Sequence, residues 1–187
     1  MNAVESGQPA NSGDGRFKQR RARHYARWRA VQALYQWDLG GEQLAEIARQ
    51  FRSVPEAEDD DIEQLRQICA QADVAYFEAL LHGVPGHLGE LDAQLELHMQ
   101  RSLQSLDPVE RVILRIGCYE LLHRIDIPYR VVINEAVELA KAFGAEQGHK
   151  FVNGVIDKAA RQIRASEVAA MQRERAAARE PRGRRGC

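Results

Sequence analysis

Apolar residues recur at intervals of three and four along most of this 187-residue chain. The most regular apolar series consists of Phe77, Leu81, Val84, Leu88, Leu91 and Leu95. This spacing is typical of an amphipathic helix whose apolar face packs on neighbouring helices. Gly83, Pro85 and Gly86 interrupt the pattern. Because an internal proline removes a backbone hydrogen bond, we expect a kink or a break near Val84.

Similar patterns predict helices through the rest of the chain. The expected helices lie at about 18–39, 42–52, 62–72, 108–124, 129–143 and 148–163. Asp107 and Pro108 provide a helix cap and a favourable first helical residue. Gly117, in the middle of its helix, costs about 1 kcal/mol relative to alanine, so we expect a close helix–helix contact there. No segment shows a convincing strand pattern, and the predicted fold class is therefore all-α.

Composition and the first residues of the chain disfavour a membrane-spanning protein and a secreted, disulfide-bonded one. Hydrophobic residues make up 44% of the chain, and no apolar run approaches the ~20 residues that would span a membrane. Residues 1–17 have no hydrophobic centre of a signal peptide, and we expect a disordered tail there. The scattered Cys69, Cys118 and Cys187 indicate a reducing, cytoplasmic setting and no disulfide framework.

Cationic residues are concentrated near both ends, although the formal net charge is only -1. Seven Lys or Arg residues lie between Arg16 and Arg29, with no acidic residue before Asp38. A basic run that continues into a helix favours a segment that holds a phosphate backbone, while a solubilising tail is the alternative. Residues 166–187 form a second basic segment, which we expect to be partly helical or disordered. An acidic loop is expected at 53–61.

Two further segments are candidates for binding. A helix that begins at Gly148 would favour an anion at its first turn, and Lys150 adds charge. Phe151 could stack on an unpaired base, or it could lie in the core. An exposed Tyr129 and Arg130 would suit a protein interface, although a tight turn between helices is the alternative.

No catalytic motif is present in the sequence. The six histidines include no HExxH motif and no cluster with metal-ligand spacing. Neither a GxGxxG nor a GxxxxGK[ST] motif occurs. We therefore expect no catalytic residue, no metal and no cofactor, and the sequence favours a binding protein.

Several segments resemble the bacterial transcription antitermination factors of the NusB family. In chain order they are RHYAR at 23–27, AVQALY at 30–35, VERVILRI at 109–116, IPY at 127–129, INEA at 133–136, LAK at 139–141 and HKFVNG at 149–154. The resemblance extends from about Arg20 to Ile163. It implies one all-helical body with an N-terminal lobe at about 18–100 and a C-terminal lobe at about 101–165.

The resemblance also implies a non-enzymatic function. NusB proteins pair with NusE, a small-subunit ribosomal protein, and the pair binds the boxA element of nascent RNA. On RNA polymerase, with other Nus factors, this complex promotes antitermination of ribosomal RNA operons. The residues that the resemblance assigns to RNA phosphates are Arg20, Arg21, Arg23 and Arg27. Those that it assigns to the same RNA-facing side are Gln147, Lys150 and Phe151, and Glu110 is the candidate contact with NusE.

The sequence departs from the family pattern at one place, and three alternatives to an RNA-binding adaptor remain. His24 and Tyr25 stand where the family often has consecutive arginines, which leaves the register of RNA contacts open. Related domains serve as RNA-binding modules of RNA cytosine methyltransferases, but only about 20 residues follow the last core helix here. A homodimeric scaffold would bury the basic segment between two copies. A DNA-binding helix-turn-helix is disfavoured, because the basic residues lie at a helix entrance.

Overall fold

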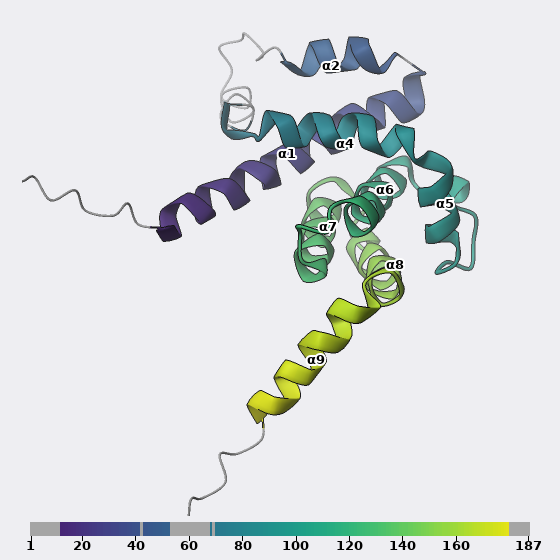
Figure 1. Ribbon diagram of the computed structural model, residues 1–187. Helices are drawn as coiled ribbons and strands as arrows, with labels where there is room; N and C mark the ends of the chain where they lie inside the picture. Colours follow the sequence, from purple (N-terminus) through teal and green to yellow (C-terminus); the bar gives the residue numbers. More distant parts are fainter. Residues whose placement is uncertain (1–11, 42, 53–67, 69, 180–187) are drawn as a thin grey trace, which may run out of the picture.

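The computed structural model describes residues 12–41, 43–52, 68 and 70–179, and every regular element within them is a helix (Figure 1). The elements are α1 (Ser12–Gly40), α2 (Leu44–Arg52), α4 (Val74–Gly86), α5 (Leu88–Glu96), the short 3-10 helix η1 (Leu103–Ser105), α6 (Pro108–His123), α7 (Tyr129–Phe143), α8 (Gly148–Ile163) and α9 (Ala165–Arg179). The predicted all-α class is confirmed. The expected acidic loop and most of the helix expected at 62–72 lie outside the described residues.

Helix α6 is the centre of the fold. It contacts α1, α4, α5, α7 and α8, and every residue from Glu110 to Leu121 is buried. The side chain of Asp107 accepts a hydrogen bond from the backbone N–H of Val109 at 2.9 Å, which confirms the predicted cap. Because α6 is buried over this length, a charged side chain on it needs a partner to offset the cost of its burial.

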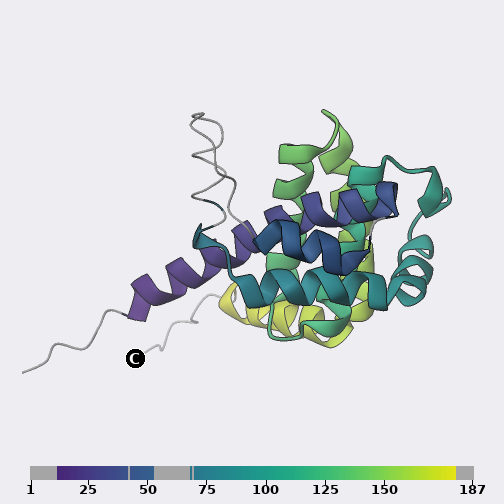
Figure 2. The same ribbon diagram turned by 90° about the horizontal axis from the view of Figure 1, so that it is seen from above.

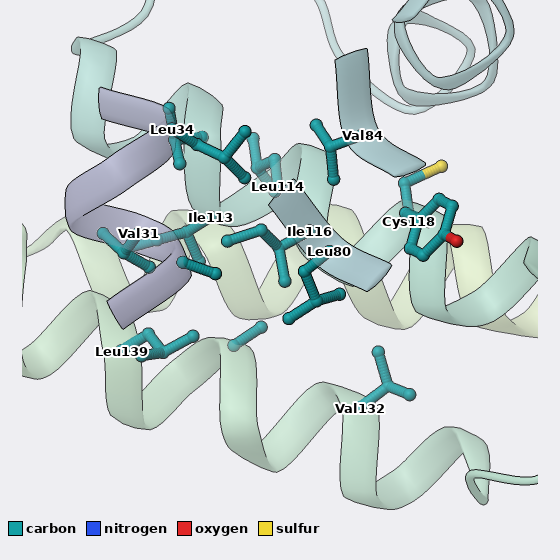
Figure 3. Close-up of a cluster of buried hydrophobic side chains, with 14 of the residues drawn as sticks. Val31, Leu34, Leu80, Val84, Ile113, Leu114, Ile116, Cys118, Val132 and Leu139 are labelled. Atoms are coloured by element: carbon teal, nitrogen blue, oxygen red, sulfur yellow. The ribbon is translucent and has the colours of Figure 1, made fainter. Parts of the chain in front are cut away.

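One buried cluster joins the helices on either side of α6. Figure 3 shows side chains of α1, α4, α6 and α7 meeting in this core, with Val31, Leu34, Leu80, Val84, Ile113, Leu114, Ile116, Val132 and Leu139 among those labelled. Helices α1, α2 and α4 pack together on one side, and α7 and α8 pack on the other. A Cβ atom at Gly117 would lie 2.9 Å from Cδ1 of Ile156 on α8, which confirms the expected close helix contact.

The long apolar series breaks where the proline predicts it. Helix α4 ends at Gly86 and α5 begins at Leu88, with His87 between them at φ -120° and ψ 18°. The apolar face continues across the break, since Val84 and Leu91 are both buried.

Both ends of the described chain are helical, where disorder was expected at the first and either helix or disorder at the second. Helix α1 begins at Ser12, so the expectation of disorder is wrong for residues 12–17. Its first half extends beyond the other helices in both views (Figures 1 and 2). At the other end α9 continues the chain after α8. Arg164, between them, donates hydrogen bonds to the backbone oxygens of Glu120, Leu121 and Arg124 at the end of α6. The oxygens of Glu120 and Arg124 also accept backbone N–H groups, so Arg164 adds to the hydrogen bonds that end this helix.

Candidate nucleic-acid interface

The basic run on α1 is divided by burial. Arg16, Lys18, Arg20 and Arg21 are exposed, whereas Arg27 and Arg29 are only 2% and 5% exposed. The change occurs where α1 enters the body of the protein and begins to contact α4, α6 and α7. Only the first part of the run is therefore exposed to a large partner.

Arg27 is buried, although the sequence analysis expects it to contact RNA. Its Nε donates a hydrogen bond to Oε1 of Glu120 at 2.8 Å, and its Nη2 donates one to the hydroxyl of Tyr76 at 3.1 Å. Its Nη1 also lies 3.5 Å from Oε2 of Glu135. Since its charge is already paired inside the protein, the structure argues against the predicted contact between Arg27 and an RNA phosphate.

Arg29 is buried against aromatic rings. Its guanidinium carbon lies 5.0 Å from the ring centre of Phe77 and 5.9 Å from that of Phe51. This contact anchors α1 on α4 and α2 through cation–π attraction. Arg29, like Arg27, is part of the fold.

Arg23 stands at the boundary between the exposed and buried parts of the run. Its Nη1 lies 3.2 Å from Oδ2 of Asp126, and its side chain is 26% exposed. The hydrogen bond from Arg124 and the charges of Arg124 and Arg23 hold the pKa of Asp126 below its ordinary value despite some burial. To contact a phosphate, Arg23 would have to exchange this carboxylate for it. Arg20 and Arg23 line a surface depression together with Arg27, Asp126, Ile127, Pro128, Val131 and Glu135.

His24 and Tyr25, at the departure from the family pattern, have defined partners. Nδ1 of His24 lies 2.8 Å from Oε2 of Glu135, and this hydrogen bond raises the pKa of His24 in spite of its partial burial. Burial alone would raise the pKa of Glu135, but the hydrogen bond with His24 and the charge of Arg27 outweigh it and the pKa is lowered. The hydroxyl of Tyr25 accepts a hydrogen bond from Nε of Arg21 at 3.3 Å.

The second candidate segment forms a cationic groove on α8. Gln147 and Lys150 are exposed, and Phe151 is half-buried. The guanidinium of Arg101 lies 4.8 Å from the ring centre of Phe151. The residues that line this surface, called here the Phe151 groove, are His98, Met99, Gln100, Arg101, Lys150, Phe151, Gly154, Val155 and Lys158. Phe151 also packs on the core cluster, which is one of the two positions that the sequence left open, and stacking on a base stays a prediction.

Sequence reasoning missed three residues of these surfaces. Lys158 lies seven positions after Phe151, which is two helical turns, so the helical period could have found it. Arg101 comes from the connection before η1, and no sequence signal points to it. Phe17 is 64% exposed beside the basic run, and an exposed aromatic ring among cations was the signal that could have found it.

The two basic surfaces are separate. The depression beside Arg20 and Arg23 shares no lining residue with the Phe151 groove in the part of the chain that the structure describes. The expectation that the two segments face one RNA therefore stays a prediction.

The residues expected at a protein interface have different surroundings. Glu110 is 8% exposed, and a Cβ atom at position 148 would lie 2.5 Å from its Oε1, so Gly148 makes room for it. Burial and the neighbouring Asp107 raise the pKa of Glu110. Tyr129 is only 7% exposed, so the expectation that it is an exposed contact is wrong. Its hydroxyl accepts a hydrogen bond from Nε of the half-buried Arg130 at 3.1 Å.

An all-helical body with an exposed basic helix and a second cationic, aromatic groove is typical of a nucleic-acid-binding adaptor. The NusB family model matches residues 24–161, and the chain belongs to the NusB family. In the described part of the chain, no helix has the length and apolar character needed to cross a membrane.

Relatives named transcription antitermination protein NusB are similar over most of their length. The protein of Alkalilimnicola ehrlichii is 46% identical over 182 residues, which cover 94% of this chain and 99% of that protein. The protein of Pseudomonas fluorescens strain Pf-5 is 46% identical over 165 residues, covering 88% of this chain and 91% of the relative.

Solved structures agree with this assignment. T. maritima NusB is 32% identical with a TM-score of 0.52, and the match covers 76% of this chain and 90% of that one. A chain from a structure of antitermination factors NusB and NusE in complex with dsRNA is 31% identical with a TM-score of 0.61, and the match covers 76% of this chain and 98% of that one.

Proposed function

We propose that this protein is a non-enzymatic, cytoplasmic RNA-binding adaptor that acts with NusE on the boxA element of nascent RNA. In this function it joins RNA polymerase and other Nus factors and promotes antitermination of ribosomal RNA operons. The observation that carries the proposal is the 46% identity to a NusB protein over 94% of this chain. The solved relative in complex with NusE and RNA supports both partners.

The exposed part of α1 is the proposed site of phosphate contacts. Arg20 and Arg21 are exposed, and a cationic helix entrance attracts RNA at long range. Arg23 joins them by exchanging Asp126 for a phosphate, because both partners are anionic and the ion pair is partly exposed to water.

The Phe151 groove is the proposed second RNA contact. Lys150 supplies charge, and Phe151 supplies a ring on which a base can stack where Arg101 does not cover it. Gln147, exposed at the start of α8, adds an amide that can both donate and accept hydrogen bonds.

Glu110 is the proposed contact with NusE. Its burial and raised pKa make a desolvated carboxyl group, which gains more from a hydrogen-bonding partner than a fully solvated one would. Arg130, which lies on a depression between α7, α8 and α9, is a second candidate for a partner contact.

A titration of RNA into the protein tests this function. Fluorescence anisotropy with boxA-like and scrambled single-stranded RNA, with and without NusE, should show tighter binding to the boxA-like RNA and a further gain with NusE. The combined variant Arg20→Ala and Arg21→Ala should weaken binding and make the slope of log K against log salt less negative by about 1.4, from about 0.7 per lost phosphate contact.

The matched control is the combined variant Arg49→Ala and Arg52→Ala. It removes the same charge from α2, where both arginines are exposed and paired with glutamates. An equal loss of affinity in both variants would show that net charge alone attracts RNA and would contradict the site on α1. Light scattering at saturating RNA separates the homodimeric scaffold from the adaptor, since a dimer that persists would favour the scaffold.

A further inference from the structure

Two histidines and a glutamate meet on the surface where α5 begins and α6 ends. His87 and Glu90 come from the start of α5, and His123 is the last residue of α6. One potential ligand atom from each side chain lies within 4.8 Å of those of the other two. The sequence analysis missed this group, because position 123 is far along the chain from positions 87 and 90.

The contacts within the group are close. Nε2 of His123 lies 3.1 Å from Oε2 of Glu90, and the ring centres of His87 and His123 are 4.1 Å apart. Two ligand atoms on one tetrahedral Zn²⁺ ion, each about 2.0–2.1 Å from the metal, lie about 3.3 Å apart. The spacing of His123 and Glu90 is therefore close to that of two ligands of one ion.

His87 is oriented by a backbone carbonyl. Its Nδ1 lies 2.8 Å from the carbonyl oxygen of Gly83. Because a carbonyl only accepts, Nδ1 of His87 must carry the proton, and in the neutral ring Nε2 is left with a free lone pair. A hydrogen bond from the ring nitrogen that does not bind the metal fixes the tautomer of metal-binding histidines.

The break between α4 and α5 explains why this carbonyl is available. The backbone N–H of His87 bonds to Val84, three residues back, at 3.3 Å, and so leaves Gly83 without its usual helical partner. Gly83 also lets α4 approach the ring of Tyr119, since a Cβ atom there would collide with Cζ of that ring. The Tyr119 ring in turn packs beside both histidines, at centre distances of 5.8 and 5.1 Å.

We propose that His87, Glu90 and His123 bind a divalent transition-metal ion of the Zn²⁺ class, which ties the start of α5 to the end of α6. Two imidazoles and one carboxylate suit Zn²⁺, Ni²⁺ or Cu²⁺ better than Mg²⁺ or Ca²⁺. For metal binding at Nε2 of a neutral His123, the ring proton is carried by Nδ1, so the ring keeps one proton and Nε2 offers its lone pair.

Equilibrium dialysis of the untagged, full-length protein against Zn²⁺ tests the proposal, with metal analysis as the readout. His87→Gln, Glu90→Gln and His123→Gln should each lower the affinity for one equivalent of Zn²⁺ by at least about tenfold. This is the lower limit for loss of a supporting group in a metal site. His82→Gln is the matched control, because His82 is exposed on α4 and lies outside the group. Circular dichroism establishes that each variant is folded.

Two results would overturn the metal site. One is Zn²⁺ binding that is equal in the wild-type protein and in all three ligand variants, which would place the ion elsewhere on the chain. The other is equal binding of Mg²⁺ and Zn²⁺, which would indicate attraction to charge without imidazole ligands.

Discussion

Arg27 on α1 and Glu120 on α6 form an ion pair inside the protein, with Nε and Oε1 2.8 Å apart and side chains that are 3% and 1% exposed. The hydroxyl of Tyr76 on α4 bonds to both. Burial raises the pKa of Glu120 to about 7, against the opposing effect of Arg27. Three helices that are distant in sequence are therefore joined by one buried polar network.

Replacement of Arg27 by alanine should destabilise the fold far more than it changes RNA binding. It leaves Glu120 buried without its cation, which costs about 3 kcal/mol, at the lower end for a broken buried pair because Glu120 can take up a proton. Urea unfolding measures this loss. Arg21→Ala, which removes an exposed cation from the same helix, should change the free energy of unfolding by less than about 0.5 kcal/mol.

The affinity of the folded fraction for RNA completes this comparison. Arg27→Ala should retain it at a temperature where the variant is folded, and Arg21→Ala should lose part of it. A stable Arg27→Ala variant with strongly weakened RNA binding would return Arg27 to the interface.

The division of the basic run shows what the sequence can reveal. Arg27 lies four and seven positions before the buried Val31 and Leu34, so the helical period already placed it on the core face. Its residue type favoured solvent, and its partner Glu120 is 93 positions away, which no local pattern can reveal.

The helix cap at Asp107, the break at Pro85 and the contact at Gly117 were predictable because each depends on local backbone chemistry. Tyr129 was mispredicted because α9 covers it, and the sequence gives no register for that packing.

Stability should fall as the pH rises through the titration of His24. The pKa of His24 is raised above its ordinary 6.5, so the ion pair with Glu135 contributes fully below about pH 6.5 and is lost as the pH passes the higher pKa of the folded protein. Glu120 acts in the same direction between about pH 4.5 and 7, because the folded state holds its proton more tightly. Urea unfolding from pH 6 to pH 9 should show the decline.

The variant His24→Gln isolates the histidine from Glu120. It should reduce the decline above pH 6.5 and leave the contribution of Glu120 below pH 7 in place. An unchanged pH profile in this variant would show that the His24–Glu135 contact does not persist in solution.

Asp38 should couple α1 to α6 strongly. Its carboxylate accepts hydrogen bonds from Nη2 of Arg111 and, at 2.7 Å, from Nη1 of Arg115, and both arginines are buried. Asp38→Ala should destabilise the protein by about 3 kcal/mol, because it leaves buried charge unpaired. Arg115 retains Asp92 at 2.8 Å, so the larger part of the loss belongs to Arg111.

A double-mutant cycle of Asp38→Ala with Arg111→Ala measures this coupling in urea unfolding. Residues that share one ion-pair network show interaction energies of about 0.5–3 kcal/mol, and the pair should fall in the upper half of that range. Additive losses would mean that the two side chains stabilise the fold independently.

Phe151→Leu should weaken RNA binding while it keeps the core contact. Leucine preserves apolar volume against the core cluster but removes the aromatic face, and loss of base stacking costs about 1–3 kcal/mol per base, or roughly five- to 150-fold in affinity. Arg101→Ala removes a positive charge but uncovers the same ring for stacking. Its loss of RNA affinity should therefore be smaller than that of Phe151→Leu. Anisotropy with boxA-like RNA measures both, and Lys141→Ala, which removes an exposed cation from α7 outside the groove, is the control. Equal affinities of wild type and Phe151→Leu would make Phe151 a packing residue only and would leave RNA binding at this surface to Lys150 and its neighbouring charges.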